Sequence, residues 1–188
     1  MKELKVTMQQ TMAHEYIAAE EIPEIELYVD QIVTLLENNL GGLRRTEGEK
    51  LLTKTMVNNY SKDGLLKRIK GKKYSKEHVL MILLIVGLKR GLSVQDIGRL
   101  LSGEEDRLSA AGGYAPEAVK ELYSAYGKTG EAVSRTLPSY VEELLQTLGA
   151  GFGKDDPVPA ILLLSEISAL CSRTAQALID ESFPEKKK

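Results

Sequence analysis

The feature that most constrains the fold is a long apolar run from Val79 to Leu88. Ser75 stands before it in the position of a helix cap, and Gly91 follows it as a helix stop. This pattern predicts an apolar helix over residues 76–89. The run has about half of the ~20 residues that a bilayer-spanning helix needs, so we expect a core helix of a water-soluble chain.

Apolar residues recur at helical spacing along much of the remaining chain. Few segments alternate with the period of a strand, so the expected fold class is all-α, with room for a small β wing. Pro138 is expected to kink or break the helix that contains it. The other expected helices cover residues 23–40, 53–62, 94–101, 116–126, 130–148 and 157–181.

Basic residues cluster in one short segment of an otherwise acidic chain. Between residues 62 and 76, seven cations face a single carboxylate, Asp63, which gives the segment a net charge of +6. The whole chain carries −2, so the rest of it carries −8. One basic patch on an acidic body is expected of a protein that binds a polyanion on one face. The seven cations are Lys62, Lys67, Arg68, Lys70, Lys72, Lys73 and Lys76.

Several classes of function find no support in the composition. One cysteine and two histidines are too few for an internal disulfide or a structural zinc site, and we expect Cys171 to be a small core residue. The start of the chain lacks the apolar segment of a signal peptide, so we expect a cytoplasmic protein. The chain has no recognisable nucleophile–base set, and we predict neither enzyme activity, nor a cofactor, nor a metal.

Three segments, taken in order along the chain, are similar to one family of regulators. The recognition helix and turn of MerR-family proteins resemble residues 52–66, LTKTMVNNYSKDGLL. Their wing exit resembles Lys72-Lys73-Tyr74-Ser75-Lys76-Glu77, and the helix pair that follows resembles residues 91–101, GLSVQDIGRLL. The resemblance covers about fifty residues and implies a winged helix-turn-helix that binds duplex DNA. The whole chain also resembles an uncharacterised bacterial family in which the elements at residues 52–56 and 72–75 recur together.

The chain departs from the MerR pattern before the recognition helix. The preceding predicted helix ends near Leu40, and about a dozen residues intervene. The first helix of the motif is therefore either the helix from Pro23 or a short turn over residues 47–51. We expect three parts: an N-terminal arm over residues 1–22, a MerR-like DNA-binding domain over 23–103, and a helical bundle for oligomerisation or effector binding over 104–188.

The candidate DNA contacts lie on one helix and on the basic wing. A helix fits the major groove, where asparagine pairs with adenine edges, and lysines beside the groove neutralise phosphates. On helix 53–62, Met56, Val57 and Tyr60 are expected to turn inward while the polar residues turn outward. The candidate contacts are Thr53, Lys54, Thr55, Asn58, Asn59 and Lys62 on the helix, and Arg68, Lys70, Lys72, Lys73 and Tyr74 on wing 67–74. Tyr74 also suits a packing role at the base of the wing.

These residues favour a sequence-specific, DNA-binding transcriptional regulator. The main alternative is a helical adaptor that keeps a winged-helix scaffold and binds a partner protein through the same basic face. A third reading adds an effector, a small molecule or a protein, bound by the C-terminal helices. A homodimer would recognise an inverted repeat, and the last helix, from Ile161 to Leu178, is either its interface or part of the monomer core.

Overall fold

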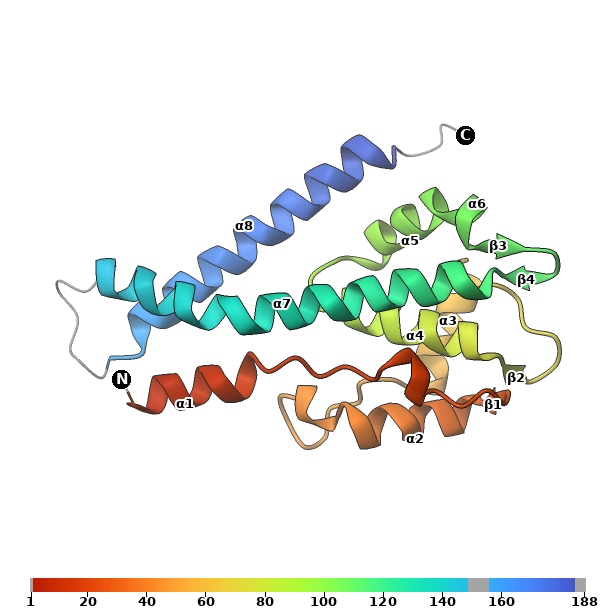
Figure 1. The fold of residues 1–188 in the computed structure, drawn as a ribbon, viewed down its shortest axis with the longest axis horizontal. Coiled ribbons are helices and arrows are strands. Elements are labelled where there is room, and N and C mark those ends of the chain that lie inside the picture. Colours follow the sequence, from red (N-terminus) through yellow and green to blue (C-terminus); the bar gives the residue numbers. More distant parts are fainter. Residues whose placement is uncertain (1, 149–155, 185–188) are drawn as a thin grey trace. The chain divides into compact units, whose positions relative to one another are not determined.

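The computed structural model describes residues 2–148 and 156–184. The described chain is mostly helical, as the sequence predicted, with eight α-helices, two short 3-10 helices and two small two-stranded antiparallel sheets (Figure 1). The expected flexible segment around Gly149 and Gly153 lies outside the described residues.

The chain forms two compact units, which are described separately. The central unit comprises residues 15–127 and 176–188, and the helical unit comprises residues 1–14 and 128–175. The boundary that the sequence suggested after Gly103 falls inside the central unit.

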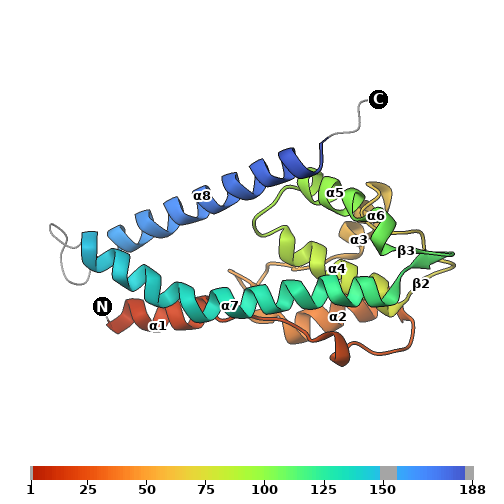
Figure 2. The same ribbon diagram turned by 45° about the horizontal axis from the view of Figure 1, so that its top comes forward.

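The centre of the first unit is the apolar helix α4 (Lys76–Leu88), which the sequence predicted. Every residue from His78 to Val86 is buried, so the helix has no solvent-facing side over most of its length. The surrounding core comes from α2 (Val29–Asn39), α3 (Lys54–Lys62), α5 (Val94–Gly103) and the first part of α7 (Pro116–Leu148) (Figure 2). Their buried contributions include Ile32, Leu36, Val57, Tyr60, Ile97, Leu101, Val119 and Tyr123.

The first expected helix of this unit begins later than the sequence suggested. Residues 23–28 are not helical, and Leu27–Tyr28 form the strand β1. Helix α2 follows directly over Val29–Asn39, after a 3-10 helix η1 (Ala19–Glu21) and before a second, η2 (Gly41–Leu43). Strand β1 pairs with β2 (Lys73–Tyr74), with Leu27 opposite Tyr74 and Tyr28 opposite Lys73. The basic segment therefore does not form a hairpin by itself. Its strand β2 pairs with β1, near the start of the unit.

Helix α3 (Lys54–Lys62), predicted over residues 53–62, begins after a side-chain cap and ends before a glycine. The Thr53 hydroxyl accepts a hydrogen bond from the Met56 N–H at 3.1 Å, and Gly64 has a φ of 77° just after the helix. The N–H groups of Leu65 and Leu66 then donate to the Tyr60 carbonyl at 2.9 and 3.3 Å. Both leucines are buried, so they fix on the core the start of the loop that follows, residues 67–72, which is called the basic loop below.

The rest of the central unit adds a second small sheet and the end of α8. Helix α5 (Val94–Gly103) is capped by Ser93, as expected, and is followed by α6 (Glu105–Leu108). Strands β3 (Ser109–Ala110) and β4 (Gly113–Tyr114) form a hairpin in a segment that the sequence suggested to be an irregular boundary. Gly112 permits this turn because its φ is 88°.

Helix α7 (Pro116–Leu148) is continuous through Pro138, so the predicted division into two helices was wrong, and of the kink or break predicted at Pro138 the break does not occur. Its glycines have a packing role instead of ending a helix. A Cβ on Gly127 would overlap the ring of Tyr16, and a Cβ on Gly130 would overlap the ring of His14. The two glycines therefore give these rings space against the helix.

The helical unit consists of α1 (Lys2–Thr11), the second part of α7 and most of α8 (Val158–Ser182). Cys171 is exposed on α8, so its expected place in a core was wrong. By length and composition α8 is apolar enough to cross a membrane, and only 6% of its most apolar window is buried. Length and composition alone do not separate a membrane span from a helix that binds another protein surface.

Candidate nucleic-acid interface

The outer face of α3 is polar, as the sequence predicted. Lys54, Thr55, Asn58, Asn59 and Lys62 are all exposed. They follow one another at spacings of one, three, one and three residues, which places them on one side of a helix. Their amides, hydroxyl and ammonium groups form a surface suited to base edges and phosphates.

The inner face of α3 holds this surface in place. Val57 and Tyr60 are 0% and 3% exposed, and Met56 is half-buried. The ammonium of Lys89, at the end of α4, lies 5.5 Å from the centre of the Tyr60 ring. Thr53 differs from the exposed candidates because its hydroxyl accepts the capping hydrogen bond of the helix. Its main role in the structure is therefore to position α3.

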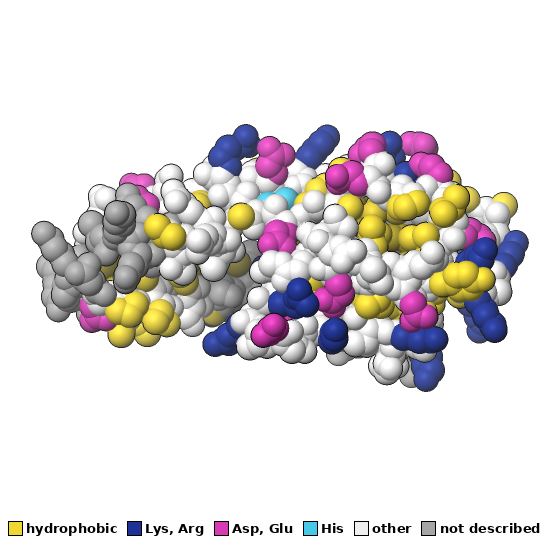
Figure 3. Space-filling view, turned by 90° about the horizontal axis from the view of Figure 1, so that it is seen from below, with side chains coloured by type: hydrophobic (Ala, Val, Ile, Leu, Met, Phe, Trp, Pro, Cys, Tyr) yellow, Lys and Arg dark blue, Asp and Glu magenta, His cyan; other side chains and the backbone are white. Residues whose placement is uncertain are grey.

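Four candidate cations of the wing are exposed, namely Arg68, Lys70, Lys72 and Lys73. Within residues 2–148 and 156–184, none of the four makes an ion pair. Several Lys and Arg side chains lie at the right-hand end of Figure 3, the end at which Figure 1 draws β1 and β2, and others lie along its upper and lower edges. Together with Lys54 and Lys62, the four wing cations provide six exposed positive charges.

Two other cations of the basic segment are already neutralised by the protein. The Lys67 ammonium lies 2.5 Å from Glu105 Oε1, and the Lys76 ammonium lies 2.5 Å from Glu24 Oε1. Only 19% and 15% of these two lysine side chains are exposed. The charge available to a polyanion is therefore smaller than the +6 counted along the sequence.

Tyr74 is only 6% exposed, which favours its packing role at the base of the wing over a direct contact with DNA. Its ring packs edge-on against His78, with 6.0 Å between ring centres, and burial raises the pKa of its phenol. His78 is itself buried, and its Nδ1 lies 2.9 Å from the Ser75 hydroxyl oxygen. Both side chains form the base on which the basic loop rests.

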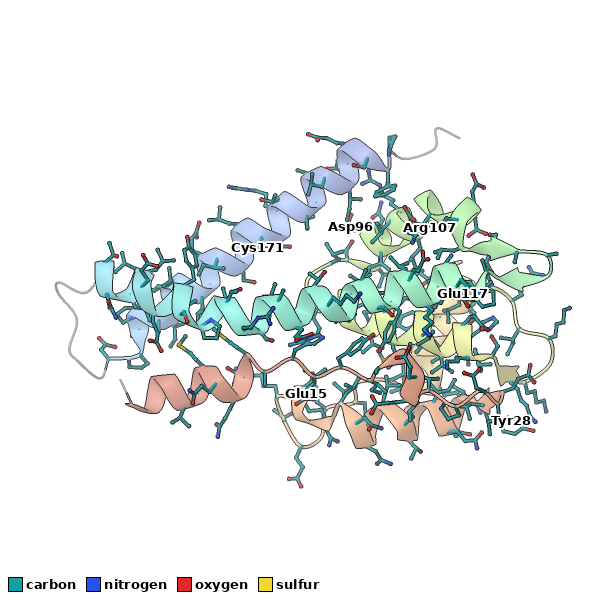
Figure 4. All side chains as sticks on the ribbon, viewed as in Figure 1. Glu15, Tyr28, Asp96, Arg107, Glu117 and Cys171 are labelled. Carbon is teal, nitrogen blue, oxygen red and sulfur yellow. The ribbon has the colours of Figure 1, made fainter. Side chains whose placement is uncertain are left out.

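Tyr28 is an addition that sequence reasoning missed. Its ring is 48% exposed, and the ammonium of the cross-strand residue Lys73 lies 5.2 Å from the ring centre. Figure 4 labels Tyr28 at the outer edge of β1. An exposed aromatic ring beside unpaired lysines is suited to contact a nucleic acid. The sequence predicted a helix from Pro23, so Tyr28 was not considered as a surface contact. The strand that contains it forms only by pairing with residues 73–74, which are distant in the sequence.

These elements lie in a part of the chain that matches a known sequence family. Residues 17–126, more than half of the chain, match the family described as a domain of unknown function, DUF1836. The chain belongs to this family. The DUF1836 match covers nearly all of the range 15–127 of the central unit, including α3, the basic loop and Tyr28. No curated protein and no solved structure matches the chain.

Proposed function

We propose that this DUF1836 domain is a sequence-specific, DNA-binding transcriptional regulator with a MerR-like winged helix-turn-helix. The observation that carries the proposal is the division of α3 into a buried apolar face and an exposed polar face, flanked by unpaired cations. In this arrangement α3 enters the major groove and reads bases through Asn58 and Asn59. Arg68, Lys70, Lys72 and Lys73 neutralise phosphates beside the groove.

The order of the elements supports this assignment. Strand β1, helices α2 and α3, the basic loop, strand β2 and helices α4 and α5 follow one another in one compact unit. Helix α2 packs against α3, whereas residues 47–51 have turn and loop conformation. We therefore assign α2 as the first helix of the proposed motif.

A protein-binding adaptor on the same scaffold is the second candidate. It is favoured by residues 40–53, which connect α2 and α3 and greatly exceed the three or four residues of a usual helix-turn-helix turn. The chain's net charge of −2 also means that the molecule as a whole does not attract a polyanion.

Fluorescence anisotropy with labelled genomic fragments tests the proposal. We expect some fragments to bind more tightly than others, and binding to weaken by orders of magnitude between about 50 and 200 mM salt. The double variant Lys70→Ala/Lys72→Ala should reduce the log–log salt slope by roughly 2, because each lost phosphate contact contributes about 0.9. The exposed cations Lys128 and Arg135 on α7 provide a charge-matched control, Lys128→Ala/Arg135→Ala, which should bind like the unmodified chain.

Two results would count against DNA binding. One is the absence of binding at about 50 mM salt, which would favour the adaptor. The other is an equal loss of affinity in both double variants, which would indicate non-specific attraction between charges.

A further inference from the structure

Most of the large apolar side chains left in contact with solvent belong to the helical unit. Eleven such residues of the described chain are exposed, and eight of them lie in residues 1–14 and 128–175. The central unit has about twice as many residues but exposes only Ile25, Tyr28 and Leu178. The eight residues of the helical unit are Val6, Val133, Tyr140, Leu148, Val158, Ile161, Leu162 and Leu170.

On α7 the apolar residues form a stripe along one side of the helix. Val133, Tyr140 and Leu148 are 49%, 55% and 53% exposed, and Leu137 and Leu144 between them are half-buried. Successive spacings of four, three, four and four residues keep all five within an arc of roughly 80°. Alternation of three and four is the spacing by which helices pair with one another. The charged residues Glu131, Arg135 and Glu142 lie on the opposite side.

The start of α8 carries further exposed apolar side chains in the same unit. Val158, Ile161 and Leu162 are 45%, 60% and 60% exposed. Glu166 is the only charged residue between Val158 and Ser172. This part of the helix therefore lacks the charges that normally cover a solvent-facing side.

The helical unit buries little of its own apolar surface. Among its described residues, only Met8, Val141 and Ala160 are buried hydrophobics. Three buried residues are few for three helices. A folded domain usually has a contiguous cluster of buried residues, each in contact with many others. The unit needs a further surface to complete its packing.

We propose that this apolar surface, Val133 to Leu148 on α7 with Val158, Ile161 and Leu162 on α8, binds a second copy of the same chain. Its exposed side chains offer roughly 600–800 Å², close to the ~800 Å² that each partner contributes to a stable interface. The three–four spacing favours pairing with another helix, and an apolar stripe is complementary to a second copy of itself. The surface also lacks the pattern of charges by which a different partner is selected. The inference does not depend on DNA binding.

Sedimentation velocity of the full chain, without DNA, tests this interface. The chain has a mass of 20.7 kDa, and we expect a species of twice that mass over about 1–100 μM protein. Tyr140→Glu and Val133→Glu should each raise the dimer dissociation constant by about tenfold or more, because both place a charge in the apolar contact. Ser139→Glu adds the same charge to an exposed position outside the stripe and should leave the constant unchanged.

Three outcomes would overturn the proposal. A monomer at every concentration would mean that another surface or partner covers these residues. A dimer that both stripe variants leave intact would place the interface elsewhere. Cosedimentation of the chain with phosphatidylcholine vesicles, abolished by the stripe variants but not by Ser139→Glu, would assign the surface to a membrane. Circular dichroism of each variant establishes that the helices remain folded.

Discussion

The ammonium of Lys67 lies 2.5 Å from Oε1 of Glu105 and so joins the basic loop to α6. The same ammonium donates to the Ser109 hydroxyl at 2.7 Å and lies 5.5 Å from the centre of the Tyr114 ring. The backbone N–H of Lys67 donates to the Tyr114 hydroxyl at 3.0 Å. Lys67 is therefore a structural cation that anchors the basic loop to the β3–β4 hairpin. The charges that remain available to a ligand belong to the other wing cations, such as Arg68 and Lys70.

Lys67→Met should destabilise the chain by about 1–2 kcal/mol, because it removes charge-assisted hydrogen bonds to Glu105 and Ser109. The matched variant Lys70→Met should leave the free energy of unfolding almost unchanged, since Lys70 is exposed and makes no ion pair among the described residues. Urea unfolding measures both. Equal stability of the two variants would contradict the anchoring role of Lys67.

Signals that act over a few residues were sufficient to predict much of the central unit. The caps Thr53 and Ser93 and the apolar run of α4 determine their helices through neighbouring residues. The division of α3 into inner and outer faces follows from the same periodicity.

What the sequence missed depends on contacts between distant segments. The sheet of β1 and β2 contains two residues from each strand, so neither strand has a pattern of its own, and Tyr28 was missed with it. Gly127 and Gly130 resemble a helix end until Tyr16 and His14 are seen to pack against them. Similarly, charge counting could not separate Lys67, which has a partner, from Lys70, which has none among the described residues.

His78 should make the stability of the chain sensitive to mild acid. Burial lowers the pKa of His78 below its ordinary value of 6.5, although the Lys67 backbone and the carboxylates of Glu77 and Glu26 act in the opposite direction. The Lys67 charge adds to the lowering. The fold therefore favours neutral imidazole, and unfolding takes up a proton. This contribution to stability is complete above the unfolded pKa and declines as the pH falls below about 6.5.

Urea midpoints at about pH 7.5 and 5.5 measure this effect, in a window above the titration of ordinary carboxylates. We expect the unmodified chain to lose more stability over this interval than His78→Gln, whatever the stability of the variant at the higher pH. Parallel pH dependence in the two proteins would show that other groups are responsible.

Tyr28 should lie against DNA if the proposed function is correct. The chain has no tryptophan, so Tyr28→Trp introduces a single fluorescent reporter beside Lys73. Its emission should change when duplex DNA is added at about 50 mM salt and should recover at about 200 mM. Leu178→Trp, at a position that is 58% exposed on α8, should not respond. An unresponsive Tyr28→Trp protein that still binds DNA by anisotropy would remove Tyr28 from the interface.

Arg99 should hold the end of α8 on the central unit. Its guanidinium donates to Asp180 Oδ1 at 2.5 Å, to the Phe183 carbonyl at 3.0 Å and to the Ile179 carbonyl at 3.3 Å. These contacts tie the last turn of α8 and the residue after it to α5, and the Ile179 carbonyl also accepts the Phe183 N–H at 2.8 Å. Arg99→Ala should therefore speed amide hydrogen exchange in residues 176–183.

The control for Arg99 is Arg107→Ala on the neighbouring helix α6. Arg107 pairs with Glu104 and Glu121 at the surface, where solvent and salt screen such pairs and they contribute little to stability. Its loss should leave exchange in residues 176–183 unchanged, whereas Arg99→Ala should increase it by about tenfold or more, because the loss of even one charge-assisted hydrogen bond has an effect of that size. Equal exchange in the two variants would mean that Phe183, whose ring fills the space beside Gly103, is sufficient to hold the helix end.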